Sequence, residues 1–158
     1  MTTTAPKFRY IGATDECIEC QKCGKPNLKY TVVLAILDAD GNEEEITYYG
    51  STCAARALAA RGMRVKGGGR EILQRAQYAT EKLNAEAKDA RRMLRLYGLP
   101  ETGDPTEAQL FQAELSYWHF HRRALWAKPV GDPMWREHVA DMLARKRATL
   151  AEAALLGL

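Results

Sequence analysis

Four cysteines are the residues of this chain whose types and spacing indicate chemistry most clearly. Cys17, Cys20 and Cys23 cluster in the segment CIECQKCGK, and Cys53 lies in the segment YYGSTCAARAL. Thiolates are preferred ligands of zinc, which takes four ligands in a tetrahedron. Two cysteines separated by two residues can bind one ion from a tight turn, and Gly24 tolerates the backbone dihedrals that such a turn requires. The spacing therefore predicts a structural zinc site.

The predicted ligands of this site are all four cysteines. Cys17 completes the set because it is only three residues from Cys20; the alternative is that Cys17 is a small buried residue and another group binds the metal. Two disulfides or a redox-active Cys-x-x-Cys are further alternatives. Residues 1–10 have no apolar segment typical of a signal peptide. We therefore expect a cytoplasmic chain whose thiols stay reduced, and this favours a metal over disulfides.

A hairpin and a helix are predicted to position the cysteines. Residues 28–37 are rich in β-branched and apolar side chains, and residues 46–49 form the returning strand after an Asp-Ala-Asp-Gly-Asn turn. Ser51 or Thr52 is predicted to cap an alanine-rich helix. Cys53 then lies in the first turn of this helix, where the helix dipole and the free amides favour a thiolate.

This layout resembles the small treble-clef or zinc-ribbon-like proteins of actinobacteria and their phages. The resemblance rests on a signature of the style C-x2-C-G-K, L-K-x-T-V and Y-x-G-S-x-C-A-A. The matching residues are Cys20, Cys23, Gly24, Lys29, Thr31, Val32, Gly50, Ser51, Cys53 and Ala54. The resemblance covers about residues 14–60 and implies a fold and a metal but no activity. The usual treble clef has a second ligand in the helix, where this chain has Arg56, so the fourth ligand must be Cys17 or another group.

The chain is predicted to have two parts, a zinc-binding hairpin and helix module over residues 1–65 and an α-helical domain over residues 66–158. The glycine-rich segment 61–69 is predicted to join them flexibly. The predicted fold class is α+β, a small zinc-stabilised β-hairpin plus helix followed by an antiparallel helical hairpin or small three-helix bundle. The spacing of apolar residues predicts helices over about residues 70–97, 104–127 and 132–155.

The last two predicted helices begin with start signals, and all three have an apolar face. Asp104-Pro105 and Asp132-Pro133 each combine a capping residue with a proline at the first helical position. The apolar residues are Ile72, Ala76, Ala79, Leu83, Ala87, Ala90, Leu94 and Tyr97 in the first helix, Phe111, Leu115, Trp118 and Leu125 in the second, and Trp135, Val139, Met142 and Leu150 in the third. The alanine-rich stripe of the first helix could pack against the other two helices or form a homodimer.

Charge placement gives the only indication of a partner. The chain has 23 basic and 20 acidic residues, and its net charge of +3 comes from the second half. Basic clusters of this kind bind phosphates, although charged helix surfaces are also common without a ligand. The residues predicted to contact DNA or RNA are Lys88, Arg91, Arg92, Arg95, Arg122 and Arg123.

No set of residues indicates catalysis, and we expect a protein that is not an enzyme. His119 and His121 are two residues apart, so on a helix they point to different faces and cannot bind one metal together. No apolar run is long enough to cross a membrane. The sequence thus predicts a small structural-zinc protein that binds nucleic acid or acts as a regulatory accessory protein. The alternative is an adaptor, with a zinc head and a helical stalk, that binds a host protein.

Overall fold

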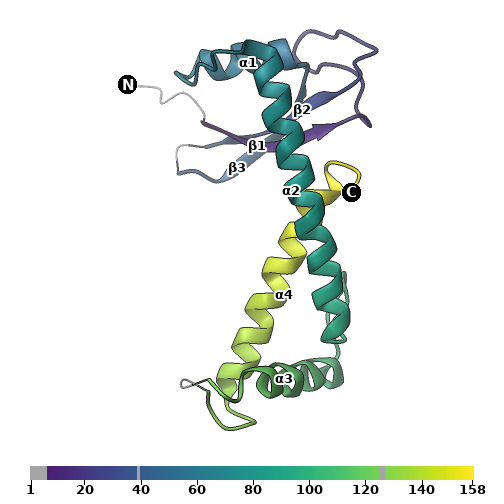
Figure 1. Ribbon diagram of the computed structural model, residues 1–158, viewed down its shortest axis with the longest axis vertical. Helices are drawn as coiled ribbons and strands as arrows, with labels where there is room; N and C mark the ends of the chain where they lie inside the picture. Colours follow the sequence, from purple (N-terminus) through teal and green to yellow (C-terminus); the bar gives the residue numbers. More distant parts are fainter. Residues whose placement is uncertain (1–6, 39, 125–126) are drawn as a thin grey trace. The chain divides into compact units, whose positions relative to one another are not determined.

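The computed structural model describes residues 7–38, 40–124 and 127–158. Within these residues the chain is α+β, as predicted, with one antiparallel sheet and four helices (Figure 1). The elements are β1 (Lys7–Thr14), β2 (Thr31–Leu37), β3 (Glu43–Tyr49), α1 (Ser51–Ala59), α2 (Gly68–Leu96), α3 (Glu107–His121) and α4 (Pro133–Ala154). They form two compact units, which we call the first unit (residues up to Leu83, with Leu155–Leu158) and the second unit (Asn84–Ala154).

The division between the units lies at Leu83, within α2, and not at the predicted boundary after residue 65. The reason is that the first part of α2 packs on the sheet: Ile72 is fully buried in the same cluster as Val32 and Leu34 of β2. The predicted flexible joint is also part of this packing, because Val65 lies against the cluster. The helical half of the chain therefore contributes to the core of the first unit.

The sheet has the order β1-β2-β3, and both neighbours of the central strand β2 are antiparallel to it. All side chains of residues 31–35 are buried, so β2 is covered on both of its faces. Sequence analysis did not predict β1. The predicted strand over residues 28–37 begins only at Thr31, and the predicted strand over residues 46–49 begins earlier, at Glu43.

The turn between β2 and β3 forms where the Asp-Gly step predicted it. The Asp38 carboxylate accepts hydrogen bonds from the backbone N–H groups of Asp40 and Asn42, at 2.9 and 2.8 Å. These bonds, with that from Asn42 the strongest, hold the pKa of Asp38 below its usual value. Gly41 has φ +90°, a left-handed conformation that glycine adopts without strain. The acidic residues here therefore organise a hairpin turn.

Gly69 allows the start of α2 to approach the backbone of α1. A Cβ atom at this position would lie 3.1 Å from the carbonyl carbon of Ser51 and 3.1 Å from the amide nitrogen of Thr52. These are backbone atoms of the helix turn that carries Cys53, so they cannot move without displacing that turn. The closeness of the two helices thus depends on the absence of a side chain at residue 69.

Gly69→Ala is expected to lower the free energy of unfolding of the first unit by about 1–2 kcal/mol, because overpacking outweighs the higher helix propensity of alanine. Denaturant titration measures this loss. Gln74→Ala, at an exposed position of the same helix, is the control. Unchanged or increased stability of Gly69→Ala relative to the control would contradict this account of the packing.

In the second unit, α3 lies across the ends of α2 and α4 (Figure 1). The shared core contains Leu94, Tyr97, Leu99, Ala113, Val139, Met142 and Leu143. The apolar face predicted for α3 is wrong, because Phe111, which was predicted to lie on it, is 58% exposed. The buried residue of α3 is Ala113, and Leu110 and Tyr117 pack beside it. Leu125, also predicted for this face, lies outside the described residues.

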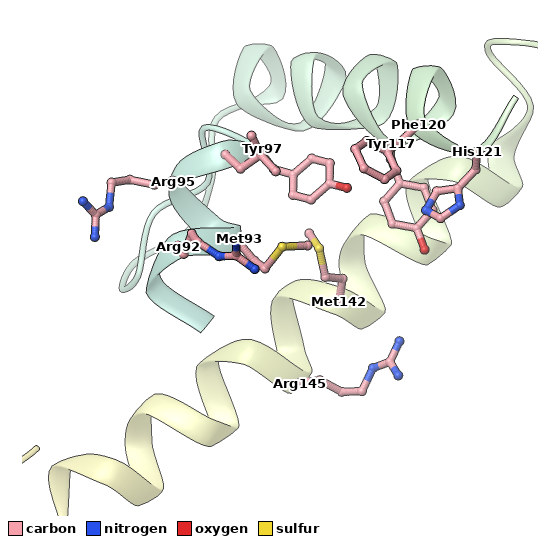
Figure 2. Close-up of a pocket in the computed structure, with 10 residues that line it drawn as sticks. Arg92, Met93, Arg95, Tyr97, Tyr117, Phe120, His121, Met142 and Arg145 are labelled. Atoms are coloured by element: carbon pink, nitrogen blue, oxygen red, sulfur yellow. The ribbon is translucent and has the colours of Figure 1, made fainter. Parts of the chain in front are cut away.

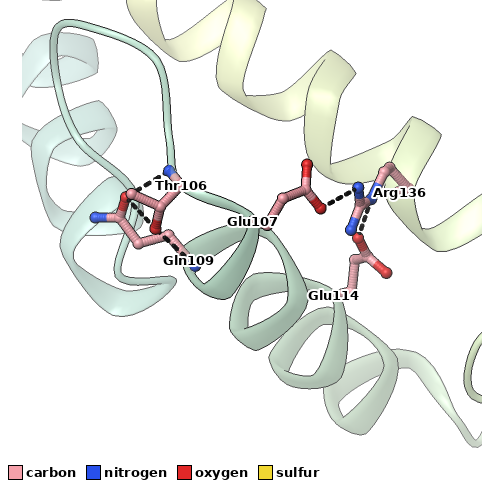
Figure 3. A network of polar contacts seen from close by, with 5 residues as sticks. All are labelled: Thr106, Glu107, Gln109, Glu114 and Arg136. Carbon is pink, nitrogen blue, oxygen red and sulfur yellow. Dashed lines mark hydrogen bonds and ion pairs between the residues drawn. The ribbon is translucent and has the colours of Figure 1, made fainter.

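The ends of α3 and α4 are set by local hydrogen bonds. Thr106, and not Asp104, caps α3, and it forms a capping box with Gln109 (Figure 3). Asp132 caps α4 as predicted, because its carboxylate accepts a hydrogen bond from the Met134 N–H at 3.0 Å. Arg136 of α4 forms ion pairs with two glutamates of α3, Glu107 and Glu114, which join the two helices.

The alanine-rich stripe of α2 is buried within the chain. Ile72 and Ala76 belong to the core of the first unit, and Leu94 and Tyr97 belong to the core of the second. The stripe therefore packs against the sheet in the first unit and against α3 and α4 in the second, and not only against the two following helices, as one of the two alternatives expected. Among the described residues, no helix combines the length and the apolar character needed to cross a bilayer.

Candidate metal centre

A tight turn between β1 and β2 positions two of the cysteines. The N–H groups of Cys23 and Gly24 both donate to the carbonyl oxygen of Cys20, at 3.3 and 2.8 Å. Gly24 has φ +67°, which explains the glycine at this position. The Gln21 N–H donates to the Tyr48 carbonyl at 3.0 Å, and the Tyr48 N–H donates to Oε1 of Gln21 at 2.7 Å. The turn is thus fixed to the end of β3.

The start of α1 brings Cys53 close to the turn that carries Cys20 and Cys23. Gly50 follows β3 directly and is the N-cap of α1, without the side-chain cap predicted from Ser51 or Thr52. Cys53 therefore lies in the first turn of α1, as predicted. A Cβ atom on Gly50 would lie 3.8 Å from Sγ of Cys20, an ordinary van der Waals distance, so the start of α1 lies directly beside the cysteine turn.

Cys20, Cys23 and Cys53 form a group whose Sγ atoms all lie within 4.8 Å of one another. Tetrahedral zinc with Zn–S bonds of about 2.3 Å places its sulfur ligands about 3.8 Å apart, so only a small contraction would bring these thiols to one ion. All four cysteines of the chain are free. Cys20 is buried, whereas Cys23 is exposed and Cys53 is half-buried. The arrangement can hold a metal ion.

The structure does not bring Cys17 into this group. Its thiol donates instead to the carbonyl oxygen of Glu19, at 3.5 Å. The Cys17 backbone is held in place by Thr31, whose fully buried hydroxyl donates to the Cys17 carbonyl at 2.9 Å. Among the described residues, therefore, three thiols and not the predicted four are in position for a metal.

The surroundings of Cys20 and Cys53 shift the pKa values of these two thiols in opposite directions. Burial raises the pKa of Cys20, but backbone hydrogen bonds from Gly50, Cys23 and Lys22 outweigh this effect and lower the pKa to about 7. Burial, together with hydrogen bonds and charge from the other two thiols, raises the pKa of Cys53 to about 11. In the metal-free chain Cys20 is thus the first of these two to become a thiolate.

The thiols open into a small hollow of about 340 Å³. Lys25 and Arg56 contribute positive charge to its lining, and Ser51 and Thr52 contribute hydroxyl groups. Among the described residues that line it there is neither a carboxylate nor a histidine. A metal-bound water here would thus lack the usual general bases of metal-dependent hydrolysis.

The basic residues predicted to contact nucleic acid all lie in the second unit. Lys88, Arg91, Arg92 and Arg95 occupy one face of α2, because their spacing is that of one helix face. Arg92 forms an ion pair with Asp89 at 2.9 Å, and Arg91 lies 3.7 Å from a carboxylate oxygen of Glu101. The α2 cluster is therefore partly neutralised, although the Arg92 side chain is still 76% exposed.

The second basic pair follows the end of α3. Arg122 is the C-cap of α3 and places its guanidinium 5.8 Å from the centre of the Trp118 ring. Arg123 is exposed. His119 is exposed, and His121 contacts the Tyr117 ring at 4.4 Å between centroids, so these two histidines differ in surroundings as predicted.

No protein-family model, curated protein or solved structure matches this chain. The resemblance to treble-clef or zinc-ribbon proteins therefore stays a prediction from the cysteine signature. The site has to be interpreted from its own geometry.

Proposed function

We propose that this chain is a zinc-centred accessory protein that binds nucleic acid. The observation that carries the proposal is the convergence of three thiols, from two elements far apart in sequence, to within 4.8 Å of one another. Thiolate ligands favour zinc over the hard cations magnesium and calcium. Zinc held by Cys20, Cys23 and Cys53 joins the cysteine turn to the first turn of α1 and stabilises the first unit. The fourth ligand in this proposal is a water molecule and not Cys17.

The affinity for zinc is expected to fall at least about 100-fold per pH unit below pH 7, and less steeply above it. Zinc binds thiolates, and below pH 7 both Cys20 and Cys53 carry a proton that must leave. Above pH 7, Cys20 is already a thiolate, and Cys53 still loses its proton on binding. Competition with a chelator of known affinity between pH 6 and 8 measures this dependence. An affinity independent of pH would contradict binding through these thiols.

Nucleic-acid binding is supported by the basic face of α2. Lys88 and Arg95 are exposed, and neither has an ion-pair partner among the described residues. Phosphates of a nucleic acid are suitable partners for such unpaired cations. The basic residues belong to the second unit and the thiols to the first.

Titration of the zinc-loaded chain against labelled DNA and RNA at several salt concentrations tests this function. The affinity is expected to fall steeply with salt, with a slope of about −0.7 per phosphate neutralised on a single strand. Lys88→Gln/Arg95→Gln should reduce the slope by about 1.4. Arg64→Gln/Arg70→Gln removes the same charge from exposed positions of the first unit and is the matched control. The absence of binding at low salt would contradict the proposal.

A protein-protein adaptor is the second candidate. The observation in its favour is that large apolar side chains are exposed on the second unit, with Phe111 58% and Val130 52% exposed. An adaptor predicts a stable complex with one protein that survives nuclease treatment, together with no binding to DNA or RNA at low salt.

A further inference from the structure

The second unit has a hollow of about 790 Å³ between the end of α2, α3 and α4. This volume lies within the range of about 300–1,000 Å³ that is usual for ligand pockets. Figure 2 shows the rings of Tyr97 and Tyr117 and the side chains of Met93 and Met142 between the three helices. The Tyr97 and Tyr117 rings are 5.9 Å apart between centroids. The interior is therefore aromatic and polarisable.

The rim of this hollow is cationic. Arg92, Arg95 and Arg145 line it, and no acidic residue is among the described residues that do so. Arg145 forms an ion pair with Asp141 at 2.5 Å, and Arg92 forms one with Asp89. Arg95 is exposed, and the structure gives it no carboxylate partner within the described part of the chain. A ligand with an aromatic body and a negative charge matches this lining.

A second hollow, of about 380 Å³, lies next to the first. The two share Leu96, Tyr97 and Phe120 in their linings, so these residues form the wall between them. Phe120 is 74% exposed and Leu96 is 62% exposed, although both are large apolar side chains. An exposed phenylalanine between two hollows can be covered by one planar group on each side.

We propose that the two hollows bind neighbouring unpaired bases of a single-stranded nucleic acid, stacked against Phe120, with a phosphate of the same strand at Arg95. This inference rests on the nucleic-acid binding proposed above and specifies its substrate. Sequence-tolerant binding of single strands combines basic residues along the backbone with aromatic side chains that stack on bases. Lys88, on the same face of α2 as Arg95, extends the basic surface beyond the hollows.

A duplex does not suit this site. Paired bases are stacked within the helix and present only edges and phosphates, so they cannot enter an aromatic hollow unless they leave the stack. A duplex would not stack on the aromatic side chains of the lining, whereas the arginines can bind the phosphates of either a duplex or a single strand. Preference for unpaired over paired strands therefore distinguishes stacking at Phe120 from simple charge attraction.

The test is a fluorescence-anisotropy titration of the full zinc-loaded chain with labelled oligothymidylate and oligouridylate of about 12 nucleotides, and with a duplex of the same length. The wild-type chain is expected to bind both single strands at least tenfold more tightly than the duplex. Phe120→Ala should weaken single-strand binding about tenfold and leave duplex binding unchanged. Phe120→Tyr should restore it, since the ring is kept.

Phe111→Ala is the matched control, because Phe111 is an exposed phenylalanine of the same helix that lines neither hollow. It should bind as the wild type does. Equal binding of single strands and duplex, with Phe120→Ala indistinguishable from Phe111→Ala, would overturn the stacking site and leave the proposed function standing. No binding of any oligonucleotide at low salt would overturn both.

Discussion

Replacement of Cys20 or Cys53 by serine is expected to abolish stoichiometric zinc binding and to unfold the first unit. Structural zinc contributes on the order of 10 kcal/mol to the folding of comparable small modules. This is as large as the whole stability of a typical domain, about 5–15 kcal/mol. Both residues lie where the cysteine turn meets α1, so without the metal the turn and the helix lose the link that one ion makes between their thiolates.

Metal analysis and an amide correlation spectrum measure this effect. The resonances of β1, β2 and β3 should lose their dispersion, and the helical signal of the second unit should persist. A strong chelator should reproduce the result with the wild-type chain. Cys17→Ser is the matched control, since Cys17 lies outside the thiol group, and it should keep one zinc per chain. Full zinc content in Cys20→Ser would contradict the account.

Trp135→Ala is expected to destabilise the second unit by about 3–5 kcal/mol, the usual cost of removing a buried aromatic side chain. Trp135 is 1% exposed, and its indole N–H donates to the Pro129 carbonyl at 2.9 Å. Its ring lies 6.1 Å from the Tyr117 ring and 6.2 Å from the His138 ring, between centroids. The substitution therefore leaves a cavity between α3 and α4 and removes one of the two hydrogen bonds that the Pro129 carbonyl accepts, the other being from the Asp132 N–H.

Denaturant unfolding followed by circular dichroism measures this loss. Phe111→Ala, an exposed substitution on α3, should change stability by less than about 0.5 kcal/mol. Zinc content should stay at one ion per chain in both variants, because the thiols belong to the first unit. A loss below 1 kcal/mol for Trp135→Ala would show that the core of the second unit does not depend on this residue.

The long helices could be predicted because their signals are local. The apolar residues of α2 recur every three or four positions, and Asp132 and Pro133 mark the start of α4 in adjacent positions. β1 lacks such a signal, since a strand of this kind is stabilised by its partner, and its partner β2 lies beyond the whole cysteine loop.

The spacing of apolar residues was not sufficient to predict which face of α3 is buried. Two sets of apolar residues have helical spacing in this segment, one containing Phe111 and Leu115 and the other containing Ala113 and Tyr117. Only the packing of α3 against its neighbours decides which set is buried, and it is the one with Ala113. The hollows beside Phe120 could not be predicted for the same reason, because the larger is lined by α2, α3 and α4 and the smaller by the end of α2 and by α3.

The sequence predicted the type of ligand at the candidate metal site, but only three of the four predicted cysteines lie together there. Cys20, Cys23 and Cys53 are brought together by a turn and a helix start that the sequence signals locally. The position of Cys17 depends on the path of the loop, which a buried hydrogen bond from Thr31 sets. Spacing alone could not reveal that contact.

X-ray absorption spectroscopy of the zinc-loaded wild-type chain tests the central claim most directly, since it counts the sulfur atoms bound to the metal. The account predicts three sulfur ligands at about 2.3 Å and one lighter ligand. A zinc ion with four sulfur ligands would place Cys17 in the site, and one with no sulfur ligand would contradict the thiol centre altogether.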